Sequence, residues 1–344
     1  MHKKITVLLS CSLFYFTAFG CDLCSIYISL DPNGSDNSFG MRYRYRVFEK
    51  DYYKESFYMI NNTTQKGQIN SKHGASRDQT IKTTEKFKLS ELYNSYDVFA
   101  NFYLNPRLQL NLSTYFADNY MLNDDSTTTN IAGIGDASAI LKYRLFNSKK
   151  CTDSLKNRFV HRVTVGGGID LPTGKYNKRT ITDIQTEIEP NTIIGTAIEE
   201  LDPHIQAGTG SISYLFLAEY MTKINNIGLN TNVSYKLTTA NKNGFRFANR
   251  FNANGTVFFL LNLSEKLRAM PFVGATYETS ERDSQDDIPV LGSGGKALFF
   301  NGGLNFFINK LSVEFSYYTP FYEDLLDDQP FNKNRMITQL VYYF

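Results

Sequence analysis

The amino-acid sequence predicts an all-β fold, namely a transmembrane antiparallel β-barrel of about 12 strands with short periplasmic turns and long extracellular loops. Three observations predict this fold: segments in which polar and apolar residues alternate, connections that are short and long by turns, and a last strand that ends on an aromatic residue. The protein has 344 residues and a formal net charge of +2. Its overall charge therefore indicates no strongly acidic or basic partner.

The first 20 residues have the organisation of an export signal. Lys3 and Lys4 precede an apolar stretch over residues 5–19, which ends beside small residues at the positions that signal peptidase recognises. We therefore expect residues 1–20 to be a signal peptide that the mature protein lacks. After this segment no apolar run has the length of a membrane-spanning helix, which excludes helical membrane proteins.

Residues 21–38 form a predicted short periplasmic segment that contains Cys21 and Cys24. The C-x-x-C spacing can hold a disulfide or bind a soft metal ion. Ser25 stands where covalent haem attachment requires a histidine, and Ala18 stands where a lipobox usually has leucine. Three interpretations of the two cysteines stay open: a disulfide or idle thiols, a metal site, and lipidation of Cys21. The sequence indicates no other cofactor.

Alternation is clearest in the segment 39–48. Arg42, Arg44 and Arg46 occupy every second position, and the intervening residues are apolar or aromatic. Because successive side chains leave opposite faces of a strand, the pattern predicts one charged face and one apolar face. Such a strand fits a nucleic-acid surface, a soluble sheet with one wet face, or a barrel wall between lipid and lumen. The absence of a basic excess disfavours nucleic acid.

The same alternation recurs along the chain and predicts twelve strands. Most are longer than the roughly five or six residues usual in globular proteins, and they suit a tilted crossing of a bilayer. The strands are expected near residues 39–48, 92–104, 107–117, 134–146, 158–171, 204–222, 226–238, 246–262, 266–279, 296–308, 310–320 and 333–344.

The connections between these segments distinguish a membrane barrel from a soluble sandwich. The even-numbered connections are mostly short, and the odd-numbered ones are mostly long and polar. A soluble sandwich has no reason to keep its long loops at one end, whereas an outer-membrane barrel has short periplasmic turns and long outer loops. The barrel is therefore expected over residues 39–344, with both termini in the periplasm. The long connections are expected at 49–91, 118–133, 172–203, 239–245, 280–295 and 321–332.

The C-terminus agrees with this class. The chain ends in MITQLVYYF, and a final amphipathic strand with a terminal aromatic residue resembles the signal that the bacterial barrel-assembly machinery reads. We expect that machinery to bind through Phe344. The other expected partners are outer-membrane lipid, lipopolysaccharide and a small-molecule solute, with no nucleic acid. The expected location is the outer membrane of a Gram-negative bacterium, and the expected state is a monomer.

Sorting the strand residues by face places many ionisable side chains in the lumen. One interpretation is a selectivity lining, in which arginines attract anionic solutes. The other is a ladder of salt bridges that fills and braces a small barrel. Arg42, Arg44 and Arg46 are the first candidates for solute contact. The candidate solute-binding residues are Arg42, Arg44, Arg46, Asp136, Lys142, Arg144, Arg162 and Arg250, and the same sorting also places Lys236, Asp97, Asp170, Glu219, Glu278 and Glu314 in the lumen.

The predicted outer loops and the histidines are further candidates for cation binding and for catalysis. Several outer loops carry acidic runs, which can bind a divalent cation, repel anions or simply be solvated. Two of these runs include Asp202 and Asp283. After the signal the chain has His73, His161 and His204, and no serine-containing motif beside His204 reads as a nucleophile. His204 is expected to open a strand at the outer rim. An enzyme is therefore not expected.

Three segments resemble a known family. GIGDASAILKYRL (133–145), LPTGKY (171–176) and GTGS (208–211) are similar to outer-membrane transporters named for the meta-cleavage pathway of phenol degradation. The Cys21-x-x-Cys24 start resembles Bacteroidetes-type members, although their further Gly-Cys is missing. The resemblance implies passive movement of small, aromatic or hydrophobic solutes across the outer membrane. The alternative is a non-conducting structural or accessory barrel of a surface or secretion complex. The matching residues are Gly133, Gly135, Asp136, Lys142, Tyr143, Leu171, Pro172, Thr173, Gly174, Gly208 and Gly210.

Overall fold

A computed structural model describes residues 36–60, 79–124, 126–148, 159–177, 179–185 and 193–344. The predicted signal peptide and most of the segment 21–38, with Cys21 and Cys24, lie outside the described residues. The same is true of His73. No helix in the described part of the chain is long and apolar enough to cross a bilayer.

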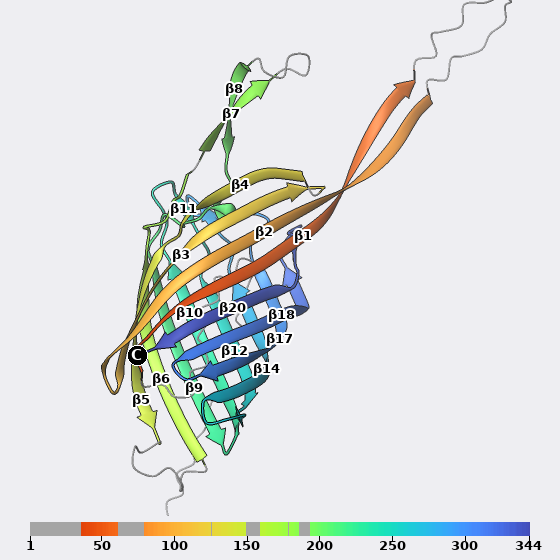
Figure 1. Cartoon of the computed structure of the whole chain (residues 1–344). Helices are drawn as coiled ribbons and strands as arrows, with labels where there is room; N and C mark the ends of the chain where they lie inside the picture. The colour runs from red at the N-terminus through yellow and green to blue at the C-terminus, as the bar shows by residue number, and fades with distance from the viewer. Residues whose placement is uncertain (1–35, 61–78, 125, 149–158, 178, 186–192) are drawn as a thin grey trace, which may run out of the picture.

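Twelve antiparallel strands close into a barrel, as the sequence predicts (Figure 1). Each strand pairs with its neighbours along the chain, and β1 pairs with β20 to close the ring. Closure is necessary in lipid because an open edge would leave unpaired N–H and C=O groups, each costing several kcal/mol. The wall consists of β1 (Ser38–Ile60), β2 (Gln79–Asn105), β3 (Leu108–Asn123), β4 (Ser126–Ile134) continued by β5 (Ala137–Asn147), β6 (Phe159–Leu171), β9 (Ser213–Ile224), β10 (Ile227–Thr238), β12 (Arg250–Phe259), β14 (Leu267–Ser280), β17 (Gly295–Ile308), β18 (Leu311–Leu325) and β20 (Arg335–Tyr343).

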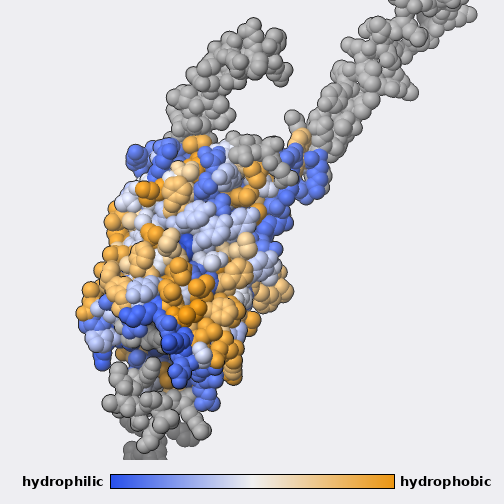
Figure 2. All heavy atoms as spheres, viewed as in Figure 1, coloured by the Kyte–Doolittle hydropathy of each residue, from blue (hydrophilic) through white to orange (hydrophobic). Residues whose placement is uncertain are grey.

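The two faces of the wall differ as the alternation predicts. Met41 on β1 is 55% exposed on the outside, whereas its neighbour Arg42 points inward and contacts Gln339 of β20. On β18 the apolar Val313 faces outward, and Glu314, at 1% exposure, faces inward. Figure 2 shows hydrophobic residues over the wall on the face in view, with hydrophilic residues toward the upper rim and the lower end. The barrel therefore has an apolar exterior and a polar interior.

The lower end of the barrel in Figure 1 carries the short turns and the C-terminus. β9 and β10 are joined by two residues, and so are β17 and β18. Asn225 and Asn309 supply the positive φ values of 54° and 52° that these tight turns use. β13 (Leu261–Asn262) extends the wall beside β14 near another short turn. The long connections lie at the opposite end, as predicted.

Two predicted outer loops are instead continuous strands. β1 and β2 pair from Ser38 to Ile60, so much of the predicted loop 49–91 is a long hairpin that extends beyond the rim (Figure 1). The predicted loop 118–133 is likewise paired, through β3 and β4. On β1 the alternation stops at Glu49, Lys50 and Asp51, three consecutive charged residues, so the pattern does not reveal that the strand continues. It is held by cross-strand ion pairs such as Lys88 with Glu49 at 2.9 Å.

The third outer connection also differs from the prediction. The strand expected from residue 204 begins at Ser213, and residues 201–212 instead turn into the lumen with the 3₁₀ helix η1 (Pro203–Ile205). Ile205 and Ala207 are almost completely buried. The remaining outer elements are the hairpin of β7 (Arg179–Gln185) and β8 (Ile193–Glu200), the small sheet of β11 (Phe245–Arg246), β15 (Ser284–Gln285) and β16 (Ile288–Pro289), and β19 (Phe331–Asn332), which pairs with β1.

Candidate functional site

A cavity with a volume of about 210 Å³ lies inside the barrel. It extends from Tyr103 and Arg107, beside a short turn, to Asp136 and Thr209, where the third outer loop enters the lumen. We call it the inner cavity. Its charged lining consists of Arg42, Arg44, Arg107, Lys142, Arg144, Arg162 and Lys236 with Asp97, Asp136, Asp170 and Glu219.

The arginines of β1 are fixed in place by one carboxylate. Arg44 Nη2 lies 2.8 Å from Asp97 Oδ1, and Arg42 Nη1 lies 3.6 Å from Asp97 Oδ2. Arg42 Nε also donates a hydrogen bond of 2.9 Å to Gln339. The pairing of β1 with β2 places Arg42 directly opposite Asp97, so the strand register itself assembles this cluster.

Aromatic rings accompany the cations of the inner cavity. The guanidinium of Arg42 lies 5.1 Å from the ring centre of Phe99, and that of Arg144 lies 5.6 Å from the ring centre of Tyr103. Arg144 also donates to the carbonyl oxygen of Pro106 at 3.2 Å. Such stacking orients the flat guanidinium groups along the wall and leaves their edges for hydrogen bonds.

Two further ion pairs cross the inner cavity lining. Lys236 Nζ lies 2.7 Å from Asp170, and Arg162 Nη2 lies 3.4 Å from Glu219. A salt-bridge ladder is therefore present, as one interpretation of the sequence proposed. The cationic side chains of the lining nevertheless outnumber the anionic ones by three.

Asp136 connects the third outer loop to the wall. Its carboxylate accepts hydrogen bonds from the backbone N–H of Gly174 at 3.0 Å, the N–H of Thr209 at 2.9 Å and the hydroxyl of Thr209 at 2.5 Å. Gly208 packs so closely that a Cβ there would lie 2.7 Å from the Cα of Gly174. The three segments that carry the family resemblance thus meet at one point. Asp136 lines the inner cavity, but its oxygens hold the loop.

Two smaller cavities of about 50 Å³ each lie alongside the inner cavity lining. One is lined by Arg46, Arg250 and His204, and the other by Arg44, Arg46 and the Arg335–Glu278 pair. Arg44 and Arg46 each border more than one cavity. All eight candidate solute-binding residues from the sequence therefore line a cavity of the barrel interior.

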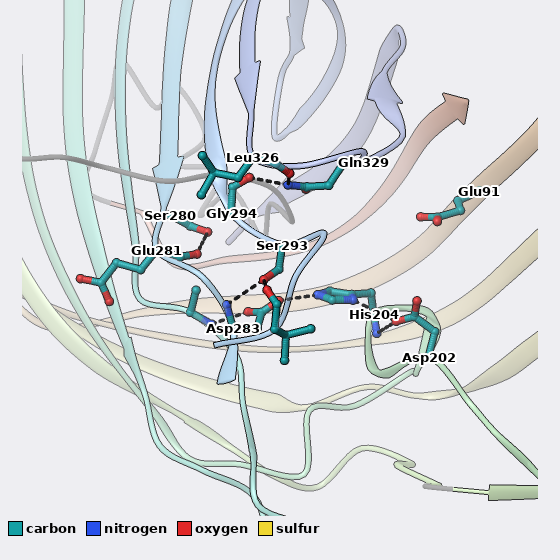
Figure 3. A network of polar contacts seen from close by, with 12 residues as sticks. Glu91, Asp202, His204, Ser280, Glu281, Asp283, Ser293, Gly294, Leu326 and Gln329 are labelled. Atoms are coloured by element: carbon teal, nitrogen blue, oxygen red, sulfur yellow. Dashed lines mark hydrogen bonds and ion pairs between the residues drawn. The ribbon is translucent and has the colours of Figure 1, made fainter. Parts of the chain in front are cut away.

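Three outer loops meet at His204, which contacts Asp202 and Asp283 (Figure 3). Its Nδ1 lies 2.9 Å from Asp202 of the same loop, and its Nε2 lies 2.8 Å from Asp283 of the loop 281–294. Phe245 and Phe247 of the loop 239–249 present their rings edge-on to the imidazole, with ring centres 6.1 and 5.7 Å away. We call this arrangement the mouth clamp.

The electrostatics of the mouth clamp favour an imidazolium. Burial alone would lower the pKa of His204, but the carboxylates of Asp202 and Asp283 raise this pKa well above its usual value. Burial likewise opposes ionisation of Asp283, yet its bond to His204 leaves the pKa of that carboxyl below its usual value. Asp283 also accepts the N–H of Ala248 at 2.6 Å. The charged pair therefore ties all three loops together at neutral pH.

Sequence reasoning missed the mouth clamp. It expected His204 at the start of a strand, and it treated Asp202 and Asp283 as members of acidic runs. Asp202-Pro203 directly before His204 was a local sign of a turn, since the aspartate caps η1. Nothing in the sequence pairs His204 with Asp283, which is 79 residues away.

No family model matches the chain, and no curated protein matches it. Among solved structures, the chain is similar to the COG4313 outer membrane channel from Pseudomonas putida F1, with a TM-score of 0.53 and 16% identity over 94% of this chain and 100% of that one. The translocator domain of the autotransporter NalP from Neisseria meningitidis gives a TM-score of 0.42 at 8% identity over 92% and 91% of the two chains. The first similarity supports the fold, a closed antiparallel β-barrel.

Proposed function

We propose that this barrel is a channel through which small solutes cross the outer membrane passively. The observation that carries the proposal is the inner cavity, a space of about 210 Å³ lined by charged and aromatic side chains in the barrel interior. A purely structural barrel of this size can be filled by its own large side chains. The structural similarity to a protein described as an outer membrane channel supports the same function.

The solutes are small, and aromatic or hydrophobic molecules are the class that the resemblance of the three motif segments favours. Two features of the lining support this part of the proposal. Phe99, Tyr103 and Tyr115 present rings to the inner cavity, and Ile140 and Leu215 add apolar surface. A ring can therefore be accommodated between apolar and aromatic walls while its polar substituent meets an arginine.

The mouth clamp sets the access from outside. The inward loop 201–212 is bound to the wall at Asp136 and to the other outer loops at His204. We therefore propose that the outer loops restrict conduction and that the inner cavity selects among solutes.

A non-conducting accessory barrel is the second candidate, and one observation favours it. The β1–β2 hairpin continues beyond the rim, which is a suitable shape for contact with a surface or secretion complex. The expected partners remain part of the proposal: outer-membrane lipid, lipopolysaccharide, the barrel-assembly machinery through Phe344, and a monomeric state. We propose a transport role and not an enzymatic one.

Single-channel recording in planar bilayers tests this function. The refolded barrel, verified by heat-modifiable migration in a gel, should give discrete current steps at low ionic conductance. The heat-denatured protein is the control and should give none. A folded barrel that never conducts would replace the channel proposal by the accessory one.

A further inference from the structure

The inner cavity has an uneven charge lining. Of its four acidic side chains, Asp97, Asp170 and Glu219 each contact a lysine or arginine within 4 Å. The fourth, Asp136, is occupied by the N–H groups and the hydroxyl of the loop that it holds. The lining still contains three more cationic than anionic groups. A solute in this cavity therefore meets a positive field.

The geometry of the barrel strengthens that field. The cavity is surrounded by a wall whose outer face contacts lipid, so the medium around it has a low dielectric constant. Clefts of one charge sign with low-dielectric walls concentrate the field and raise the local concentration of ions of the opposite sign. A cation or a zwitterion of matched size gains less from the same surroundings.

The remaining lining suits a flat ring. Lys142 and Arg144 project from one face of β5, and Arg144 lies over the ring of Tyr103. Ile140 precedes them on the same face, and Leu215 of β9 lines the same cavity. Cationic groups beside apolar and aromatic surfaces match a planar molecule that carries a carboxylate or sulfonate.

We propose that the inner cavity is a binding site for small aromatic anions, with Lys142 and Arg144 contacting the anionic group. This inference rests on the proposed channel function, because it names the class of solute that the channel selects. A site for aromatic anions differs from a channel for uncharged hydrophobic molecules, because such molecules would not interact with the excess of cationic side chains.

Benzenesulfonate is a suitable probe because it is aromatic and anionic at every working pH. Benzyltrimethylammonium is its cationic counterpart, and benzyl alcohol is an uncharged one. Reversal potentials across a gradient of each salt give the relative permeability of the ions. The wild-type channel should prefer chloride over potassium and benzenesulfonate over benzyltrimethylammonium.

The Lys142→Glu variant reverses one charge of the lining, so the anion-to-cation permeability ratio should fall about threefold or more. Lys86→Glu makes the same change on the projecting hairpin, where Lys86 pairs with Asp51 outside the cavity, and should leave the ratio unchanged. An unselective or cation-preferring wild type that conducts would overturn the anion site and leave the channel function standing.

Calorimetric titration of the detergent-solubilised barrel provides a readout that does not require conduction. Benzenesulfonate should bind the wild type and Lys86→Glu, bind Lys142→Glu at least about tenfold more weakly, and outcompete chloride at equal concentration. Binding to a folded barrel that shows no current would retain the site and overturn the channel. If chloride competed equally with benzenesulfonate, the cavity would be a site for inorganic anions, which would contradict the proposed preference for aromatic anions. Equal binding of benzyl alcohol would contradict the anionic part.

Discussion

The inner cavity and the mouth clamp occupy the same barrel but are built in different ways. The side chains of the inner cavity come almost entirely from wall strands, and β-sheet register alone places Arg42 opposite Asp97. The mouth clamp is made by three loops, which His204 and its two carboxylates hold together. The cavity that we propose to select solutes is thus fixed by the rigid wall, whereas the clamp that we propose to restrict access depends on a few polar contacts that can be broken without unfolding the barrel.

Of the variants that test the difference between the two regions, His204→Ala is expected to have the largest effect. The change leaves Asp283, which is 2% exposed, without its imidazolium partner, and breaking a buried pair in this way costs about 3–5 kcal/mol. The loops should separate, and single-channel conductance should rise while ion preference stays as in the wild type. His161→Ala is the matched control, since His161 contacts Tyr220 on β9 far from the mouth clamp. Unchanged conductance in His204→Ala would show that the clamp does not restrict the mouth.

The next largest effect concerns the wall itself. Met41→Arg places a charge on the lipid face and should cost roughly 2–4 kcal/mol near the bilayer midplane. Tyr43→Arg should cost less, because the Tyr43 hydroxyl bonds Asn94 and lies nearer a polar end of that face. Arg44→Gln, on the lumen side, keeps a hydrogen-bond donor beside Asp97 while Arg42 still pairs with that carboxylate, so it should fold and alter ion preference. Heat-modifiable migration in gels compares the folding of the three variants. Better folding of Met41→Arg than of Arg44→Gln would mean that the two faces are exchanged.

A smaller effect is expected where the third outer loop contacts the wall. In Gly208→Ala the new Cβ would lie 2.7 Å from the Cα of Gly174 and 2.9 Å from Asp136, so the loop has to move. Overpacking of this kind costs about 1–3 kcal/mol. Conductance should become noisier, with the ion preference retained. The matched control is Gly255→Ala on the wall, where the new Cβ would meet only Thr231 Cγ2 at 3.9 Å, so this variant should behave as wild type.

The smallest effect is expected from pH, because neutral His204 keeps one of its two hydrogen bonds. The pKa of His204 is raised in the folded protein, so its contribution is complete below about pH 6.5 and is lost as pH rises through the folded pKa. Asp202 and Asp283 have lowered pKa values, so their contribution is lost only as pH falls through those values. The other groups facing the clamp are Arg250, which acts on Asp283, and Tyr176, which is coupled to both His204 and Asp202.

Conductance should therefore be lowest near neutral pH and rise toward alkaline and strongly acidic solutions. His204→Ala should remove the alkaline rise, and Lys142→Glu should retain it. A flat profile in the wild type would show that the protonation of His204 has no influence on the outer mouth.

The wall was predictable from the sequence because one face of each strand contacts lipid and the other faces the lumen, so apolar and polar residues alternate along the strand. Arg42, Arg44 and Arg46 alternate with apolar residues only as long as one face contacts lipid. Glu49, Lys50 and Asp51 end the alternation on β1, but the strand continues beyond them. The same reasoning failed at His204, whose position depends on Asp283 in a distant loop. Asp136 lines the inner cavity, and its bonds to Gly174 and Thr209 join segments that no local pattern connects.

The claim that selection and restriction lie in separate parts of the lumen is tested most directly by recording single channels of two variants beside the wild type. Lys142→Glu should change the anion-to-cation permeability ratio without raising conductance, and His204→Ala should raise conductance without changing the ratio. A folded wild type with no current would contradict the channel function. Variants that both change the same property would contradict the division between the inner cavity and the mouth clamp.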